Sequence, residues 1–201
     1  MENSVASKSS AILQKIVIVL LYGLLLTPVL LSAKFFFPYI STKTFFVRLI
    51  VEIALVFYVL LAAAEPRFRP PLPRLSQAVF LYLGIIFAAS VFGVNFYRSF
   101  WGNTERGEGI LTFLHVILYF GMLTGMLKSW RAWQNFFIFS VLVSFASAIY
   151  ATLQKMGASF VVVGDASRVS ALIGNAAFYA GYLGFHIFLA IWLFSTKRPV
   201  W

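Results

Sequence analysis

The sequence contains no cysteine. This absence excludes disulfides, cysteine-ligated zinc, iron–sulfur clusters and thiol nucleophiles from the chain. Charge is scarce as well, because Asp, Glu, Lys and Arg make up 11% of the 201 residues, against about 25% in a typical soluble domain. A chain with so few polar residues cannot cover a water-facing surface, so we expect its solvent to be the lipid bilayer.

Acidic residues are the scarcest of the charged types. Six Asp and Glu stand against sixteen Lys and Arg, which gives a formal net charge of +10. Such a charge suits anionic lipid headgroups or a phosphorylated lipid substrate. Nucleic acid would require a basic patch on a soluble module. Because the sequence has no such module, we expect membrane lipids and no nucleic acid among the partners.

Apolar residues dominate what remains, at 61% of the chain. Six apolar stretches approach or reach the roughly 20 residues that a helix needs to cross a bilayer. The loops between them are short, and we find neither an internal repeat nor a segment long enough for a soluble domain. We therefore predict an all-α, polytopic helical membrane protein, with one transmembrane domain over residues 1–201. Its spans are expected near residues 16–33, 45–64, 76–94, 110–127, 133–153 and 175–194.

The first apolar stretch has an alternative interpretation as a cleaved signal peptide, with Lys8 and Lys15 as its basic flank. Its apolar run exceeds the roughly 7–15 residues of a signal-peptide core. A small residue is expected three positions before a cleavage site, and Leu31 is bulky there. We interpret residues 16–33 as an uncleaved anchor.

Membrane orientation follows from the Lys and Arg residues near the ends of the spans. With a cytoplasmic N-terminus, nine of them lie inside and six outside, while Arg48 lies within a span. The inner set is Lys8, Lys15, Arg67, Arg69, Arg74, Lys128, Arg131, Lys197 and Arg198, and the outer set is Lys34, Lys43, Arg98, Arg106, Lys155 and Arg168. We predict a cytoplasmic N-terminus, which places residues 99–109 on the outer face.

Small residues recur at one-turn spacing in the last three predicted spans. This pattern lets helices approach closely in lipid, so we expect these spans to pack as a bundle. The residues are Gly121 and Gly125 in the fourth span, Ser140, Ser144 and Ala148 in the fifth, and Ala176, Ala180 and Gly184 in the sixth.

Four ionisable residues lie within predicted spans, where charge is costly unless it is paired or hydrated. Arg48 and Glu52 are four residues apart and share a helix face. They form either a site or relay, or an internal ion pair with Arg48 reaching outward, and the spacing favours the ion pair. His115 and His186 can shuttle protons near neutral pH, but most such histidines form hydrogen bonds across helices. We retain His115 as a candidate substrate contact.

The segment SFWGNTERGEG is an unusual polar cluster between two apolar runs. Turn formation and headgroup anchoring explain single residues of it, but Trp101, Glu105 and Arg106 together exceed what a two-helix turn requires. A second outer loop carries Arg168 and ends at Asn175, where the last span begins. Asn175 is placed to cap that helix, whose free N–H groups favour an anion.

Two segments resemble bacterial O-antigen ligase and O-antigen polymerase-like proteins: SFWGNTERGEGILTFLHVILYF and SRVSALIGNAAFYAGYLGFHIFLAIWL. Their order and separation also match, and the resemblance covers residues 98–193. It implies a multi-pass protein of the bacterial cytoplasmic (inner) membrane. Such a protein transfers a glycan from a polyprenyl diphosphate carrier to an acceptor glycolipid or glycan at the outer face, without a metal or other cofactor.

The resemblance also suggests substrate-binding residues. Arginines neutralise the carrier diphosphate, since guanidinium pairs with phosphate oxygens in a bidentate way, and Arg98, Arg106 and Arg168 are the outer candidates. Glu105 or Glu108 would hold Arg106, and Trp101 would anchor the loop at the headgroups. Asn175 would support the second loop.

The sequence departs from this family in one large respect. Family members carry about twice as many spans, and their essential arginine and histidine residues lie in and around the second half. We therefore expect an N-terminal fragment or a shortened relative, we assign no catalytic residue, and whether the chain alone is an enzyme stays open. The alternatives are a transporter or channel subunit, a polyprenyl-lipid flippase component and a non-catalytic membrane scaffold.

Overall fold

A computed structural model describes residues 2–103, 106–158, 161–162 and 168–196. Within these ranges the regular elements are helices, and no strand is formed. Five helical segments are long and apolar enough to cross a membrane. The predicted fold class, an all-α polytopic membrane protein, is confirmed. The orientation of its N-terminus and the assignment of a single domain stay predictions.

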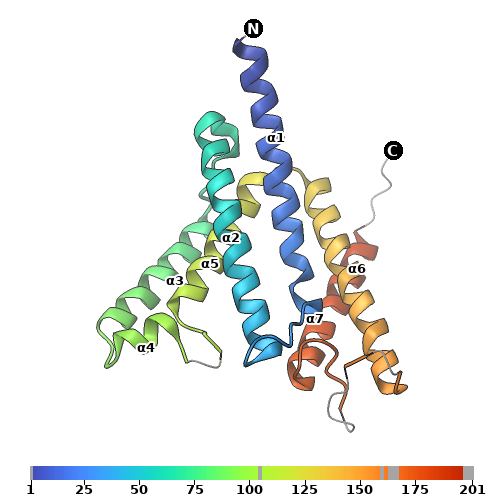
Figure 1. Cartoon of the computed structure of the whole chain (residues 1–201). Helices are drawn as coiled ribbons and strands as arrows, with labels where there is room; N and C mark the ends of the chain where they lie inside the picture. The colour runs from blue at the N-terminus through green and yellow to red at the C-terminus, as the bar shows by residue number, and fades with distance from the viewer. Residues whose placement is uncertain (1, 104–105, 159–160, 163–167, 197–201) are drawn as a thin grey trace. The chain divides into compact units, whose positions relative to one another are not determined.

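The helices follow one another along the chain, and the longest connection, residues 156–175, lies between α6 and α7 (Figure 1). They are α1 (Glu2–Gly23), the 3₁₀ helix η1 (Leu24–Val29), α2 (Pro38–Ala64), the 3₁₀ turn η2 (Pro66–Phe68), α3 (Arg74–Val91), α4 (Phe96–Trp101), α5 (Ile110–Met126), α6 (Trp130–Lys155) and α7 (Ala176–Ser195).

The helix ends differ from the sequence prediction at several places, among them at α2, which begins at Pro38 rather than near residue 45. The first span ends at Val29 rather than at residue 33, and its last turns are a 3₁₀ helix containing Pro28, which lacks the N–H that an α-helix interior requires. The helix α5 has 17 residues, fewer than the roughly 20 of a full span. The short helix α4 was not predicted. It begins at Asn95, whose side chain accepts a hydrogen bond from the Arg98 amide, as N-cap residues do.

The chain divides into two compact units, which we describe separately. Unit 1 comprises residues 1–24 and 44–128, and unit 2 comprises residues 25–43 and 129–201. The helix α2 contributes residues 38–43 to unit 2 and the remainder to unit 1.

Unit 1 is organised around α5, which packs against α1, α3, α4 and η2. Two tyrosine hydroxyls hold its parts together. Tyr119 on α5 donates to the Leu21 carbonyl on α1 at 3.1 Å, and Tyr58 on α2 donates to the Phe68 carbonyl of η2 at 2.8 Å. Each bond pairs a hydroxyl with a backbone carbonyl at the end of a helix, where carbonyls lack helical partners.

The distribution of polar and apolar side chains in α3 is the reverse of that in a soluble helix. Its two buried residues are Ser76 and Ser90, whereas Leu81, Ile85 and Phe87 are exposed. In water this arrangement would be unfavourable, because exposed apolar area costs free energy. In lipid it is expected, since lipid tails are as apolar as these side chains.

Unit 2 is built on α6 and α7, which pack side by side. Polar contacts join them: Tyr179 donates to the Ser147 carbonyl at 3.1 Å, and Ser140 bonds to His186 at 2.9 Å. The predicted small-residue face of α7 does not make this contact. Ala180 is exposed, and no neighbouring atom lies within 4 Å of a Cβ placed at Gly184, because Tyr179 and His186 of α7 face α6 instead.

Of the two glycines predicted to allow close packing in α5, the structure uses one. A Cβ at Gly125 would collide with the Tyr58 hydroxyl and with the Phe68 carbonyl oxygen. At Gly121 a Cβ would meet no atom within 4 Å. Of these two glycines, Gly125, near the end of α5, is therefore the one at which the helix closely approaches Tyr58 and Phe68.

We expect Gly125→Ala to lower the free energy of unfolding by about 1–3 kcal/mol, the usual cost of overpacking, because the backbone carbonyl of Phe68 cannot rotate aside. Gly121→Ala is the matched control and should leave stability unchanged or raise it by about 0.5–1 kcal/mol through helix propensity. Denaturant unfolding in detergent micelles measures both. Equal effects of the two substitutions would contradict this packing.

Candidate functional site

The three glycines of the segment 99–109 have a structural explanation. Gly102 has φ 79° and ψ −164°, a region open essentially to glycine alone. Its backbone also lies against that of Glu108 and Gly109, so that a Cβ at either Gly102 or Gly109 would collide with main-chain atoms. The two ends of the connection between α4 and α5 are therefore in contact, and we call its described residues, 102–103 and 106–109, the closed loop.

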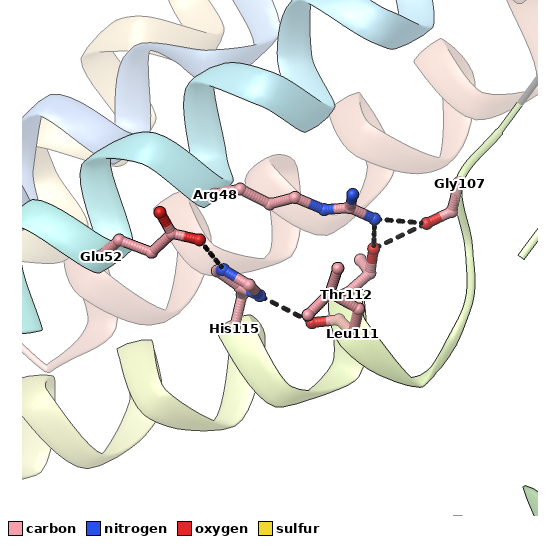
Figure 2. A network of polar contacts seen from close by, with 6 residues as sticks. All are labelled: Arg48, Glu52, Gly107, Leu111, Thr112 and His115. Atoms are coloured by element: carbon pink, nitrogen blue, oxygen red, sulfur yellow. Dashed lines mark hydrogen bonds and ion pairs between the residues drawn. The ribbon is translucent and has the colours of Figure 1, made fainter. Parts of the chain in front are cut away.

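The closed loop is fastened to α2 by Arg48, as Figure 2 shows. Its Nη2 donates to the Gly107 carbonyl oxygen and to the Thr112 hydroxyl, both at 2.9 Å. Thr112 in turn donates to the same Gly107 oxygen at 2.7 Å. Gly107 has φ +60°, and a Cβ there would lie 3.4 Å from the guanidinium. A left-handed, side-chain-free residue therefore brings its carbonyl within reach of Arg48.

The expected ion pair between Arg48 and Glu52 is wrong. The guanidinium turns toward the loop instead, because a carbonyl and a hydroxyl there accept its hydrogen bonds. Glu52 pairs with His115 of α5, with 3.1 Å between Oε1 and Nε2 (Figure 2). The imidazole is buried, at 5% side-chain exposure, and the carboxylate is 65% exposed.

No sequence signal could have found this pair. Glu52 and His115 are 63 residues apart, and the pattern that identifies ionisable partners on one helix does not extend across two. The sequence did mark both residues individually as ionisable groups within spans. The structure brings them together and separates Glu52 from the partner that local spacing had suggested.

The other candidates of unit 1 lie on or beside the closed loop. Arg98 and Arg106 are exposed. Trp101 is exposed and packs edge-on against Phe100, with 5.1 Å between ring centroids, an arrangement suited to headgroup anchoring. Glu105 lies outside the described residues, so its predicted contact with Arg106 stays a prediction.

Arg168 and Asn175 belong to unit 2. Arg168 is exposed. The predicted cap is confirmed, because the Asn175 side chain accepts hydrogen bonds from the amides of Ala177 at 2.9 Å and Phe178 at 3.3 Å. These are amides that an anion at this helix end would use. Asn175 thus takes up the donors that we expected to be available for a substrate phosphate.

Lys43 is a structural residue that sequence reasoning missed. Its ammonium donates to three backbone carbonyl oxygens, those of Leu30 at 3.0 Å, Tyr39 at 2.8 Å and Leu172 at 2.7 Å. An ammonium has three donors, so all are used within unit 2. The sequence counts Lys43 only as an outer positive charge, because carbonyl partners leave no pattern in side-chain types.

His186 follows the simpler of its two interpretations. Its Nδ1 lies 2.8 Å from the Tyr182 carbonyl oxygen, and its Nε2 lies 2.9 Å from the Ser140 hydroxyl on α6. A neutral imidazole satisfies both contacts, with a hydrogen on Nδ1 and a hydroxyl donating to Nε2. The histidine joins two helices.

Among the described residues, no group of three or more His, Asp or Glu side chains could hold a metal ion. Comparison with known protein families, with curated proteins and with solved structures found no match for this chain. The structure itself defines the class, a multi-pass helical membrane protein. A function must therefore be argued from its residues.

Replacing Arg48 with Met should loosen the closed loop while removing a charge from a membrane span. Hydrogen bonds to charged groups contribute about 1.5–3 kcal/mol, so amide hydrogen exchange in residues 102–109 should accelerate about 10–100-fold. Exchange followed by mass spectrometry in lipid nanodiscs measures this. Arg98→Met, at an exposed position outside the Arg48 contacts, is the control, and unchanged exchange in Arg48→Met would refute the role assigned to Arg48.

Asn175→Ala should lower the free energy of unfolding by about 1 kcal/mol, as losses of N-caps do. Asn175→Asp keeps an acceptor oxygen at the same place and should stay close to the wild type. Unfolding of the two variants under identical detergent conditions tests this, and an equally large loss in Asn175→Asp would argue against capping.

Proposed function

We propose that this chain is part of an O-antigen ligase/polymerase-like transferase in a bacterial inner membrane. It would act at the outer face, moving a glycan from a polyprenyl diphosphate carrier to an acceptor glycolipid or glycan. The multi-pass architecture supports this proposal, since a lipid-linked donor must be reached from within the bilayer. The resemblance of residues 98–193 to that family supplies the substrate class.

The observation that carries the proposal is the closed loop with its two exposed arginines. Arg98 lies on α4 immediately before the loop, and Arg106 lies within it. Three features hold the loop: the backbone contact at Gly102, the backbone contact at Gly109, and the hydrogen bonds from Arg48. A cation on a fixed loop binds an anion with less loss of conformational entropy than one on a mobile loop.

For glycan transfer, the protein needs to supply mainly positive charge and the positioning of the two substrates. The acceptor hydroxyl attacks the sugar carbon bound to the carrier and releases its proton to water, that carbon–oxygen bond breaks, and the carrier diphosphate leaves. Negative charge grows on the departing diphosphate, and guanidinium groups stabilise it through charge-assisted hydrogen bonds. Arg98, Arg106 and Arg168 are proposed for this role, with Trp101 anchoring the loop.

A second candidate function, membrane transport, is favoured by a single observation. Glu52 and His115 form a polar pair inside the spanning helices of unit 1, and ionisable groups at such positions mark substrate or proton pathways in many transporters. This candidate does not use Arg98, Arg106 or Arg168, so charge reversal in the loops distinguishes the two functions.

Arg106→Glu and Arg168→Glu, made in the full protein of the source cell, should each reduce glycan transfer about 10–100-fold. This range corresponds to losing one or two charged hydrogen bonds of about 1.5–3 kcal/mol. Arg106→Lys should lose less, because it keeps the charge and loses only the bidentate geometry. Glycan attached at the cell surface, resolved on gels, measures transfer.

Arg74→Glu is the matched control, since Arg74 is exposed on α3 and lies on the opposite predicted side of the membrane. It should leave transfer unchanged. If the loop reversals also leave transfer unchanged in protein present at wild-type level, the transferase proposal is wrong and the scaffold or transport alternatives gain.

A further inference from the structure

The hydrogen bonds of His115 determine where its ring carries hydrogen. Its Nδ1 lies 2.6 Å from the carbonyl oxygen of Leu111, one turn earlier on α5. A carbonyl oxygen only accepts hydrogen bonds. Nδ1 must therefore carry a hydrogen, and the opposite nitrogen, Nε2, bears a lone pair whenever the imidazole is neutral.

That lone pair faces a carboxylate. Nε2 lies 3.1 Å from Oε1 of Glu52, and an ionised carboxylate is also an acceptor only. Two acceptors at this distance repel each other unless a proton lies between them. The contact is satisfied by an imidazolium beside a carboxylate or by an imidazole beside a carboxylic acid. Both arrangements contain the same single proton, and both leave the pair without net charge.

The position of Glu52 makes net neutrality important. It lies 14 residues after the start of α2 at Pro38 and 12 before its end at Ala64, near the middle of the span. On the same face of α2, at helical spacing, lie Arg48 and the exposed apolar side chains of Phe45, Leu49, Val56 and Leu60. A bare carboxylate on such a face is costly in a membrane.

Arg48 does not remove that cost by pairing. It lies one turn before Glu52 and interacts with it electrostatically, but its hydrogen bonds go to Gly107 and Thr112. A proton is thus the partner that the geometry leaves for Glu52.

We propose that Glu52 and His115 form a proton-binding site within the membrane-spanning part of unit 1. The site takes one proton between Nε2 and Oε1. The carboxylate is the exposed member of the pair, and the imidazole behind it is buried. Loss of the proton leaves the pair with a net negative charge one turn from Arg48, so its binding and release change the charge of the span by one unit.

Other titratable groups on the surrounding elements are not joined to the pair by a described contact. On α2 and α5, Tyr58 and Tyr119 donate to the carbonyls of Phe68 and Leu21. The elements packed against α5 and the loop before it carry Lys8, Lys15 and Tyr22 on α1, Arg67 on η2, Arg74 and Tyr82 on α3, Tyr97 and Arg98 on α4, and Arg106 and Glu108 in the loop. Arg48 is thus the charged neighbour that acts on the pair.

The chain contains its own control. His186 has the same contact at Nδ1, with the Tyr182 carbonyl, but its Nε2 accepts a hydrogen bond from the Ser140 hydroxyl. It needs no additional proton. Because the chain has two histidines, their ring nitrogens are readily assigned in one spectrum.

The test is nitrogen-15 NMR of the full chain in lipid nanodiscs at neutral pH, with labelled histidine. We expect hydrogen on Nδ1 of both rings and an Nε2 resonance of His115 shifted from that of His186, as protonation or a hydrogen bond from a carboxylic acid requires. Glu52→Gln should move this resonance to the position of a neutral ring, since an amide donates without transferring a proton. Ser140→Ala should alter His186 alone.

Three results would overturn the proposal. They are a His115 Nε2 resonance equal to that of His186 in the wild type, a hydrogen on Nε2 with none on Nδ1, and a His115 spectrum unchanged by Glu52→Gln. The wild-type comparison needs no variant, so it remains decisive even if Glu52→Gln fails to fold. The measurement is independent of glycan transfer, and its outcome leaves the proposed function untouched.

Discussion

Buried polar groups must find their partners within the chain, and this constraint governs both units. Lipid offers no hydrogen bonds to a guanidinium, an ammonium or a hydroxyl. Arg48 meets the constraint through Nη2, which holds the backbone of a loop, although its buried Nε has no hydrogen-bond partner. Lys43 meets it by holding three carbonyls from separate segments. In each case the polar side chain fixes the position of a connection, whereas the apolar faces mainly meet lipid. Polar contacts, few as they are, thus determine how the connections lie.

Hydropathy was sufficient to predict the long helices but not α4, because the length and composition of an apolar run are local properties. Helix ends were also predictable where a cap was involved, as at Asn175. The pairing of Glu52 with His115 was not predictable, since it joins helices far apart in sequence and competes with a closer partner, Arg48. The predicted packing face of α7 was wrong for a related reason. Small residues permit close approach, as at Ala176, Ala180 and Gly184. Tyr179 and His186, however, have buried polar atoms that require a partner on α6.

At the candidate site too, the sequence predicted local features but not the contacts between distant segments. The sequence identified the segment 99–109 as unusual from its residue types, and it identified Arg48 as an ionisable group within a span. Their connection depends on the left-handed backbone of Gly107, which no pattern of side-chain types reveals. Asn175 was correctly interpreted as a cap. Its side chain accepts hydrogen bonds from the amides that had suggested an anion site, so these amides are already paired. Position and chemical type were thus predictable, and the direction in which each group donates or accepts was not.

Because Gly102 and Gly109 touch, the ends of α4 and α5 are joined at a point that does not depend on the residues between them. The segment between the two glycines connects two points that are already in contact. Its length and composition can drift during evolution without displacing either helix, since insertions into surface loops cost little free energy. A change in the length of this connection should therefore leave both helices in place, as long as the two glycines are kept.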